Sequence, residues 1–504
     1  MVGSQEFGVD IRITDTPACR NACLHESYRR GKALRRAGTS SDTDAFVRAM
    51  TKGINLEGKK VLVVGLAKTG LATARFLREK GARVSATEMR RPEEMKEAAR
   101  EMAEMNLAVE WGGHRTETFM KQDLIVVSPG VDLAIEPIQA ALKQGVRLIS
   151  EIELAYRFIS VPILAVTGTN GKTTTTVLLG EMLKEEGRRV GVGGTVGKPL
   201  ILLTDGHGEW DVLVVEISSF QLEAIETFRP RIAILLNVTE DHLDRYPGYR
   251  DYIAAKARIF ENQTPEDLAI LNRDDPVVMN LSERVISRKK FFSSKDRIDE
   301  GAFADGETIR LRLNRTEEDY PLAKARLKGA HNVENMMAAL LAARLFGCSK
   351  RAVESTLSRF EGLEHRLEFV REIDGVRYFN DSKGTNVGSV VKSLESFSEP
   401  VILIAGGKDK QGDLHPLKEL IRYHVKGLIL IGEAKERMAR ELGPLTETVI
   451  ARTLEEAVQL SHRMARRGEV VLLSPACSSF DMFKDYKERG KVFKEAVKRI
   501  GGRP

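Results

Sequence analysis

The sequence predicts an α/β protein of about three domains, in which strands and helices alternate along the chain. Three observations lead to this expectation. Residues 59–87 read as strand, glycine turn, helix and strand, and residues 161–187 and 376–480 repeat this alternation. The length of 504 residues exceeds one core at roughly 150 residues per domain. Hydrophobic residues make up 42% and charged residues 30%, as in ordinary globular proteins.

Charge and composition exclude several classes of protein. The 78 basic and 72 acidic residues nearly balance, with a net charge of +6, so nucleic acid is not an expected partner. No run approaches the ~18 apolar residues of a membrane helix and no secretory signal opens the chain, so we expect a cytoplasmic protein without a membrane partner. Four cysteines (Cys19, Cys23, Cys348 and Cys477) are too few and too scattered for a disulfide framework, which agrees with a reducing compartment.

Residues 1–50 lack the apolar periodicity of the rest of the chain. They carry a basic cluster, SYRRGKALRR, and Met50 opens the well-patterned part. Two interpretations stay open: a disordered leader, or a start placed too far upstream with Met50 as the true first residue. A nucleic-acid or membrane arm, or a metal site made of Cys19, Cys23 and His25, is less favoured because only three candidate ligands are present.

The segment after residue 59 predicts a βαβ unit. Gly65 and Gly70 lie between its first strand and its helix, but Ala67 stands where a dinucleotide fingerprint has its second glycine. The helix N-terminus is suited to a phosphate, yet a packed βαβ unit without ligand is equally consistent with the pattern. Further strands at 124–130 and 146–150 complete a small α/β domain that ends near Ser150.

The stretch AVTGTNGKTTTT, residues 165–176, predicts a phosphate-binding loop. Its first glycine is displaced, because Val166 occupies the position five residues before Gly171. A β-branched strand precedes the loop and a long helix follows it, which is the context that such a loop requires. Gly168 and Gly171 let backbone N–H groups curl around phosphate, Lys172 reaches the β- and γ-phosphates, and the Thr173 hydroxyl suits Mg²⁺.

Two later strands end in polar side chains that suit a metal. DVLVVEISSFQLE delivers Glu216 at a strand end, and IAILLNVTEDHLDRY delivers Asn237, Asp241 and His242. Each residue alone is more often a cap or a satisfied polar contact. Hard oxygen ligands at successive strand ends beside a phosphate loop together favour a metal–nucleotide site.

These motifs resemble those of the Mur ligases, and most of all of the Mur ligases that add D-glutamate. Five further segments, in this order, carry the same resemblance: YIAAKARIF, HNVEN, LEHRLE, NDSKGTN and SPACSSFDMFKDYKERG. The resemblance covers about Met50 to the C-terminus. It implies a three-domain α/β architecture: a Rossmann-like N-terminal domain for the UDP-linked substrate (51–150), a central P-loop ATPase domain (151–362), and a C-terminal dinucleotide-fold-like domain for the amino acid (363–504).

The resemblance also implies the reaction. An ATP-dependent ligase would add D-glutamate to UDP-N-acetylmuramoyl-L-alanine through an acyl phosphate, with ADP released, in peptidoglycan precursor synthesis. Two Mg²⁺ ions and a monomeric enzyme are implied as well. Such a reaction brings several anions together, so catalysis depends on positioning and on cations.

Site residues are carried over from the resemblance position by position. The implied nucleotide-binding residues are Gly168, Thr169, Asn170, Gly171, Lys172, Thr173, Asn332, Arg366 and Asp381. The implied metal ligands are Thr173, Glu216 and His242, and the implied catalytic residues are Lys172, Glu216, His242 and Lys256. The implied substrate-binding residues are Ser128, Gly130, Thr195, Ser218, Lys383, Thr385, Lys410, Ser479, Phe480 and Tyr486. Closure about a linker near Gly362 would bring Arg366 to the ATP phosphates.

Lys256 has two interpretations. From the residues alone, a lysine in YIAAKARIF is a solvated helix lysine. The resemblance implies instead that CO₂ carbamylates it, which requires a neutral amine, and burial would favour that form. Cys477 in SPACSSF is expected to be a small buried thiol, because the implied reaction needs no acyl-thiol step.

The sequence departs from the family pattern in three places. Ala86, Thr87 and Glu88 stand where Asp-Thr-Arg is common at the uridine end, so that contact must be rebuilt, with Arg90 as a candidate. Thr195 replaces a common asparagine, and Tyr486 a common phenylalanine. The substrate-binding positions named above include no carboxylate, which favours D-glutamate over L-lysine.

Three other functions stay open. A Mur ligase of different amino-acid specificity shares the ATP machinery. A folylpolyglutamate synthase has a related central domain but lacks the N-terminal unit seen here. A non-catalytic ATP-binding regulator would tolerate loss of Lys172, Glu216, His242 and Lys256, yet all four are present.

Overall fold

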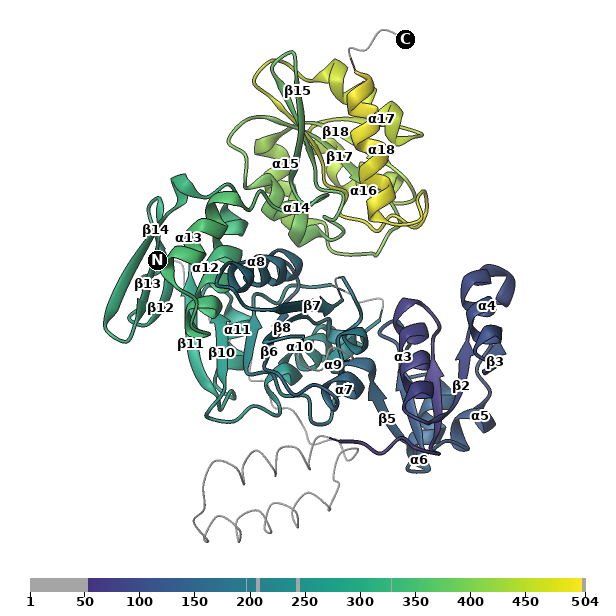
Figure 1. Ribbon diagram of the computed structural model, residues 1–504. Coiled ribbons are helices and arrows are strands. Elements are labelled where there is room, and N and C mark those ends of the chain that lie inside the picture. The colour runs from purple at the N-terminus through teal and green to yellow at the C-terminus, as the bar shows by residue number, and fades with distance from the viewer. Residues whose placement is uncertain (1–52, 196, 205–208, 242–244, 328, 501–504) are drawn as a thin grey trace, which may run out of the picture. The chain divides into compact units, whose positions relative to one another are not determined.

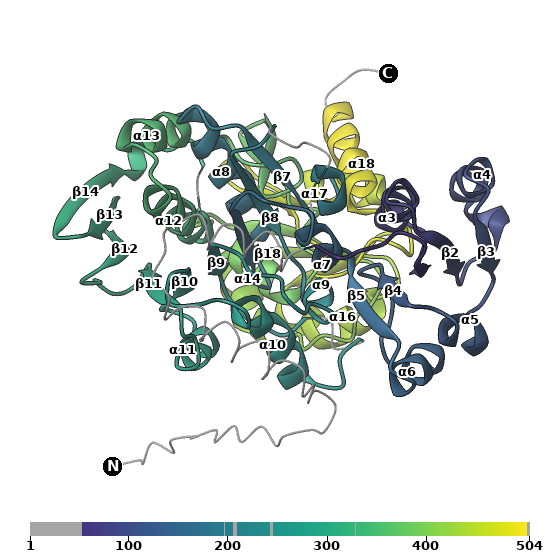
Figure 2. The same ribbon diagram turned by 60° about the horizontal axis from the view of Figure 1, so that its bottom comes forward.

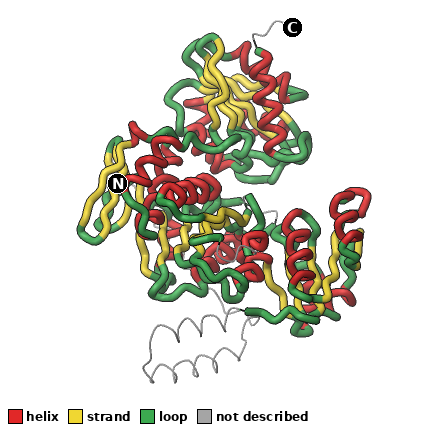
Figure 3. Tube along the Cα trace, in the orientation of Figure 1, coloured by secondary structure: helices red, strands yellow, loops and turns green. Residues whose placement is uncertain are grey.

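The computed structural model describes residues 53–195, 197–204, 209–241, 245–327 and 329–500. The interpretations of residues 1–50 therefore fall outside the described residues. Figure 1 follows the elements along the chain, and Figure 3 distinguishes the helices from the strands. No described helix combines the length and the apolar character needed to cross a membrane.

The first sheet has the strand order β3-β2-β1-β4-β5, with all strands parallel. Its strands are β1 (Lys60–Val64), β2 (Arg83–Glu88), β3 (Ala108–Trp111), β4 (Leu124–Val127) and β5 (Arg147–Ser150). Its helices are α3 (Lys68–Glu79), η1 (Pro92–Glu94), α4 (Lys96–Glu104), α5 (Thr116–Met120) and α6 (Glu136–Lys143). The chain proceeds outward from β1 and returns to β4 on the other side, so the topological switch point lies between β1 and β4, where ligands bind in such sheets.

The second sheet has nine strands in the order β14-β13-β12-β11-β10-β9-β6-β8-β7. Its strands are β6 (Ile163–Thr167), β7 (Val190–Gly194), β8 (Val212–Glu216), β9 (Ile232–Leu235), β10 (Leu268–Asn272), β11 (Arg288–Ser293), β12 (Gly301–Asp305), β13 (Thr308–Leu313) and β14 (Thr316–Pro321). The strands from β7 to β12 are parallel, and β13 and β14 add an antiparallel edge. Because β6, β8 and β9 are adjacent, their polar ends lie together.

Helices of this part connect and cover the second sheet. They are α7 (Glu151–Tyr156), α8 (Lys172–Glu185), η2 (Leu200–Leu203), α9 (Ser219–Leu222), α10 (Tyr249–Ala257), η3 (Arg258–Phe260), α11 (Pro276–Ser282), η4 (Leu322–Lys324), α12 (Ala330–Leu345) and α13 (Lys350–Arg359). Helices α8 and α12 lie side by side (Figure 1, Figure 2). The run Met336–Ala343 of α12 is fully buried, as expected for a helix apolar on all sides.

The third sheet has the order β15-β16-β20-β17-β18-β19, parallel except for the β15–β16 hairpin. Its strands are β15 (Glu368–Ile373), β16 (Val376–Asn380), β17 (Val401–Gly406), β18 (Val425–Ile431), β19 (Glu447–Ile450) and β20 (Val470–Leu473). Its helices are α14 (Val387–Leu394), η5 (His415–Leu417), α15 (Lys418–His424), α16 (Lys435–Leu442), η6 (Gly443–Leu445), α17 (Leu454–Met464) and α18 (Tyr486–Arg499). The expected α/β class with mainly parallel sheets is confirmed. The domain boundaries at 150 and 362 stay a prediction.

Candidate functional site

The phosphate loop joins β6 to α8. Gly168 and Gly171 have positive φ, 148° and 83°, and a Cβ on Gly171 would lie 2.1 Å from Asn335 Oδ1. Only glycine suits a left-handed residue so close to a neighbour. Asn170 N donates to Asn237 Oδ1 (2.8 Å), which ties the loop to the segment after β9. The strand–loop–helix geometry therefore forms despite Val166.

Two lysines lie at this loop, of which Lys256 is buried and Lys172 is half-buried. Lys172 Nζ donates to the carbonyl oxygens of Gly168 (2.9 Å) and Thr169 (2.8 Å), and burial lowers its pKa. Lys256 on α10 is 1% exposed, and its Nζ donates to the same Gly168 oxygen (2.8 Å). Burial, followed by the neighbouring Lys172 charge, lowers the pKa of Lys256 well below its ordinary value. The interpretation of Lys256 as a solvated helix lysine is wrong, because α10 turns this side chain into the protein.

Glu216 supplies a negative charge that acts on both of these lysines, as Asp241 also does. It ends β8, is 3% exposed, and its charge acts on Lys172, Lys256 and Lys383. Its Oε2 is buried and has no hydrogen-bond partner among the described residues. A buried carboxylate oxygen without a donor is costly, and a cation would satisfy it. The expected third metal ligand, His242, lies outside the described residues.

Side chains from the third sheet reach the phosphate loop. Arg366 Nη2 donates to Thr173 Oγ1 (2.6 Å), across 193 positions of sequence. Lys410 Nζ lies 3.6 Å from Asp241 Oδ1, and Asn386 Nδ2 donates to Asp241 Oδ2 (2.9 Å). A carboxylate therefore does border the amino-acid positions, but Lys410 and Asn386 already contact it.

Two further residues at this site, Asn386 and Ser389, were not evident from the sequence. Ser389 Oγ donates to Asn170 Oδ1 (2.8 Å), and Asn386 caps α14 by accepting from Ser389 N (2.8 Å). The available signal was an Asn that precedes a helix in NDSKGTNVGS, and it predicts the cap but not the contact with the phosphate loop.

A cavity of about 610 Å³ lies between these groups. It is large enough for a nucleotide and a small amino acid. The predicted site residues that line it are Asn170, Gly171, Asn332, Arg366, Asp381, Lys383 and Lys410. Asp381 is held by the hydroxyls of Ser393 and Ser474 (both 2.7 Å), and burial raises its pKa to about 6. Its carboxylate is thus already engaged within the protein.

Other predicted substrate residues lie near the third sheet's strand ends but do not line this cavity. Thr385 follows Lys383 in one loop, and Ser479 is 2% exposed. Phe480, beside it, is 69% exposed. Tyr486 opens α18 with its ring against Lys383.

The predicted residues for the UDP-linked substrate lie at strand ends of the first two sheets. Ser128 follows β4 and donates to Gly65 O (2.8 Å) across the switch point, and Gly130 follows in the same loop. Thr195 follows β7 and donates to Gln221 Oε1 (2.8 Å), and Ser218 caps α9 with the same glutamine. These groups come from both sheets and suit a long substrate.

Glu88, where the sequence departs from the family pattern, is contacted by residues of its own domain. Glu88 is buried, accepts from Leu66 N (2.8 Å), and pairs with Arg90 Nε (3.0 Å). The Arg90 hydrogen bond and those from the Leu66 and Arg90 backbones outweigh burial and lower the pKa of Glu88. Arg90 therefore stands at this end of the sheet, and its contact with the uridine end stays a prediction.

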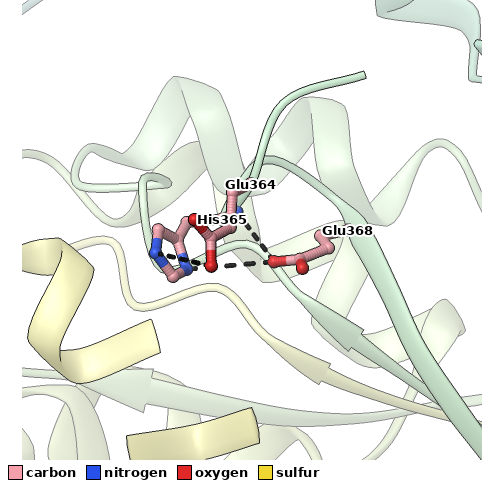
Figure 4. Close-up of side chains that lie close together, drawn as sticks. All are labelled: Glu364, His365 and Glu368. Carbon is pink, nitrogen blue, oxygen red and sulfur yellow. Dashed lines mark hydrogen bonds and ion pairs between the residues drawn. The ribbon is translucent and has the colours of Figure 1, made fainter. Parts of the chain in front are cut away.

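A separate cluster, Glu364, His365 and Glu368, brings three potential metal ligands within 4.8 Å of one another (Figure 4). Lys494 Nζ already bridges Glu364 Oε1 (2.6 Å) and Glu368 Oε1 (2.9 Å). Asn380 Nδ2 donates to His365 Nδ1 (2.9 Å), so this nitrogen's lone pair is engaged. A lysine ammonium fills the place that a cation would take.

Three family models match successive parts of the chain. A Mur ligase MurD-like N-terminal domain matches residues 59–150, a Mur ligase middle domain matches 166–343, and a Mur ligase glutamate ligase domain matches 365–477. The chain belongs to the Mur ligase family. The expected three-domain Mur ligase architecture is confirmed.

Curated Mur ligases cover most of the chain. A UDP-N-acetylmuramoylalanine–D-glutamate ligase from Geotalea daltonii is 53% identical over 449 residues, which is 89% of this chain and 99% of that protein. The ligase of the same name from Geobacter metallireducens is 51% identical over 448 residues, with the same coverage.

Solved Mur ligase structures share the fold at low identity. The MurF structure from Acinetobacter baumannii has a TM-score of 0.57 at 17% identity, and covers 87% of this chain and 91% of its own. UDP-N-acetylmuramate-alanine ligase MurC from Thermotoga maritima has a TM-score of 0.54 at 18% identity, and covers 88% and 100%. At these identities the likeness concerns the fold alone.

Proposed function

We propose that this Mur ligase joins D-glutamate to UDP-N-acetylmuramoyl-L-alanine, with ATP converted to ADP and phosphate, in peptidoglycan precursor synthesis. One observation carries the chemistry: cations gather at the phosphate loop and the cavity beside it, and most of them pair with no carboxylate among the described residues. They are Lys172, Arg366, Lys383 and Lys410. Relatives at 51% and 53% identity that carry this ligase name support the choice of amino acid.

The first step activates a carboxylate. The alanyl carboxylate oxygen of the UDP-linked substrate attacks the γ-phosphorus of ATP; an O–P bond forms, the bond to the β-phosphate oxygen breaks, and ADP leaves with the electron pair. Lys172 and Arg366 neutralise charge on the phosphates, because both lie at the loop that cradles them. In this step Lys172 exchanges its contacts with Gly168 and Thr169 for phosphate oxygens.

The second step makes the amide. The neutral amine of D-glutamate attacks the acyl carbon, the C–N bond forms, and phosphate leaves as the C–O bond breaks. The amine's proton passes to the departing phosphate or to water. Lys383 and Lys410 face the cavity and suit the two carboxylates of D-glutamate. Asp241 balances Lys410 before the substrate arrives.

The residues present fit the two Mg²⁺ ions that we propose for this site. Glu216, with its unpartnered buried oxygen, and the Thr173 hydroxyl would hold Mg²⁺, and we assign His242 to the same set. Bound Mg²⁺ supplies neutralisation of the phosphate and carboxylate charges brought together here.

We further propose that Lys256 reacts with CO₂ to form a carbamate. The neutral amine nitrogen bonds to the carbon of CO₂, and a proton is released. Burial and the neighbouring Lys172 charge favour the neutral amine that this reaction needs. The resulting anion would add negative charge next to Lys172 and would suit a metal site.

The proposed enzyme is a cytoplasmic monomer. ATP and a UDP-linked substrate are both metabolites of the cytoplasm. Light scattering of the purified protein at assay concentration tests the monomer.

The deciding experiment is an ADP-release assay over a panel of acceptors and amino acids. With UDP-N-acetylmuramoyl-L-alanine as acceptor, D-glutamate should give the fastest ADP release. If L-glutamate, L-lysine or diaminopimelate is faster, another Mur ligase specificity replaces this proposal. ADP release with a folate and glutamate would favour a folylpolyglutamate synthase, and ATP binding without turnover would favour a regulator.

A further inference from the structure

We propose that Tyr486 is a positioning residue for Lys383: the face of its ring holds the lysine ammonium at the wall of the cavity, ready for a carboxylate of the amino acid. This inference rests on the proposed function, because it assigns Lys383 to the amino-acid substrate. It gives Tyr486 a role that acts through Lys383.

The contact between the two side chains is direct. Lys383 Nζ lies 4.1 Å from the centroid of the Tyr486 ring, well within the range of a cation–π interaction. Lys383 lines the cavity, and its ammonium makes no hydrogen bond or ion pair with any described residue. In the part of the chain that the structure describes, the ring therefore contacts the ammonium directly, whereas Glu216 acts on it only through its charge.

The surroundings make this partner necessary. Burial, followed by the positive charge of Arg366, lowers the pKa of Lys383 to about 8, and Lys172 and Lys410 act in the same direction. Like charges push a flexible ammonium away from the cavity wall. A ring face attracts the cation without neutralising it, so the ammonium stays available to a substrate carboxylate. A carboxylate partner would instead compete with the substrate.

The Tyr486 ring is itself held by neighbours of Lys383. Its edge packs against the His365 ring at a centroid distance of 6.1 Å and an interplanar angle of 85°. The backbone carbonyl oxygen of Tyr486 accepts from the Ser382 hydroxyl (2.8 Å), and the backbone N–H of Lys383 donates to His365 O (3.0 Å). The lysine loop, the start of α18 and the segment before Arg366 thus fix one another.

His365 belongs to the cluster with Glu364 and Glu368 (Figure 4), and Asn380 contacts its ring. Asn380 Nδ2 also donates to Glu368 Oε2 (3.1 Å), an acceptor that fixes which way the amide points. His365 Nδ1 is therefore an acceptor and the imidazole is neutral, which agrees with the lowering of its pKa by burial. A neutral ring adds no further repulsion to Lys383.

The test varies the ring's electron density without changing its shape. Position 486 is replaced by phenylalanine and by phenylalanines that carry one, two and three ring fluorines, which weaken the negative ring face stepwise. The KM for D-glutamate should rise with each fluorine, to roughly tenfold above the Phe reference, while the KM for ATP stays within twofold. A merely structural role would not follow the number of fluorines.

A truncation completes the test. Tyr486→Leu keeps an apolar side chain but removes the ring, and it should raise the KM for D-glutamate at least tenfold with little change in the KM for ATP. Tyr423→Leu, at a tyrosine that is 72% exposed on α15, is the matched control and should resemble the wild type. A flat fluorine series, or an equal rise in both KM values, overturns the proposal.

The wild type separates this inference from the proposed function. If the wild type releases no ADP with D-glutamate, the proposed function fails. If the wild type is active and the variants at position 486 bind D-glutamate as the Phe reference does, only the role of Tyr486 fails. Should Tyr486→Leu not fold, the fluorine series still decides, because its members differ by single atoms.

Discussion

At the scale of single residues, the site depends on lysines whose ammonium groups form no ion pair with a carboxylate among the described residues. Lys256, Lys172 and Lys383 all carry a lowered pKa because α/β packing removes them from water. Strongly perturbed groups gathered at strand ends are typical of functional sites. Anionic phosphate or carboxylate groups that bind among these lysines would relieve the repulsion between them.

Lys256→Ala should be nearly inactive, with turnover reduced at least 100-fold, because it removes the amine proposed to carry a carbamate. Short carboxylic acids should restore part of the activity, since they can occupy the vacated place as anions. The measurement is ADP release with and without added acetate or formate. Lys184→Ala, at an exposed lysine on α8, is the control and should match the wild type. Full activity of Lys256→Ala would show that Lys256 is not needed for the reaction. An inactive variant that acids never restore would mean that Lys256 acts as an ordinary lysine, without a carbamate.

Glu216→Gln should need far more Mg²⁺ than the wild type. The substitution keeps the size of the side chain but replaces the unpartnered anionic oxygen by neutral groups, so the ion loses a charged ligand. ADP formation measured against Mg²⁺ concentration should shift its midpoint by at least tenfold. Near-normal turnover at low Mg²⁺ would show that Glu216 is not a ligand.

At the scale of elements, the positions of loops at strand ends bring the chemistry together. The loop before α8 forms although Val166 replaces the first glycine of the usual pattern, because Gly168 and Gly171 supply the positive φ values. Helix α7 shows the opposite case, a buried acid that its own sequence does not reveal. Glu151 opens α7, is 1% exposed, and only its Oε1 has a donor, Ile201 N at 2.7 Å.

Glu151 should make folding stability depend on pH. Burial raises its pKa from 4.5 to about 7, so between these values the folded state holds a proton that the unfolded state has lost. Stability from this group is therefore full below about pH 4.5 and falls as pH rises to about 7. The shift corresponds to roughly 3 kcal/mol.

Glu151→Gln tests that dependence. The neutral side chain cannot ionise, so the variant should gain stability relative to the wild type as pH rises from 5 to 7.5, and the difference should then stay constant. Urea unfolding at each pH measures it. Glu181→Gln, an exposed residue on α8, should show no such trend. A constant difference across this range would mean that Glu151 is ionised throughout.

At the scale of the whole molecule, the second and third sheets contribute to one site. Arg366 reaches Thr173 from a segment that precedes β15, and Asn386 and Ser389 contact residues that follow β9 and β6. Contacts over 145 to 219 positions of sequence define the cavity.

Arg366→Ala should weaken ATP binding and slow turnover together, because one guanidinium is lost from the phosphate site. We expect a loss of about 2–3 kcal/mol in kcat/KM for ATP, the range of a hydrogen bond to a charged group. Initial rates of ADP release give both constants. The control Arg359→Ala removes an exposed arginine on α13 that pairs with Glu185 at the surface, and it should leave kcat/KM unchanged. Equal constants for Arg366→Ala and the wild type would place Arg366 outside the nucleotide site.

The sequence by itself determined the local features of this protein. Alternation of strand and helix, the glycines of the phosphate loop and the carboxylate at the end of β8 are written in short stretches, because backbone conformation and side-chain period depend on near neighbours. The tertiary structure alone decided the environment of each group. In the sequence, Lys256 and Lys383 do not differ from other lysines. Only the tertiary structure shows that Lys256 Nζ donates to Gly168 O and that Lys383 Nζ lies over the Tyr486 ring. Segments from distant positions of the chain pack together and determine which groups are buried and which groups they contact. This packing removes water from around a lysine and thereby lowers its pKa.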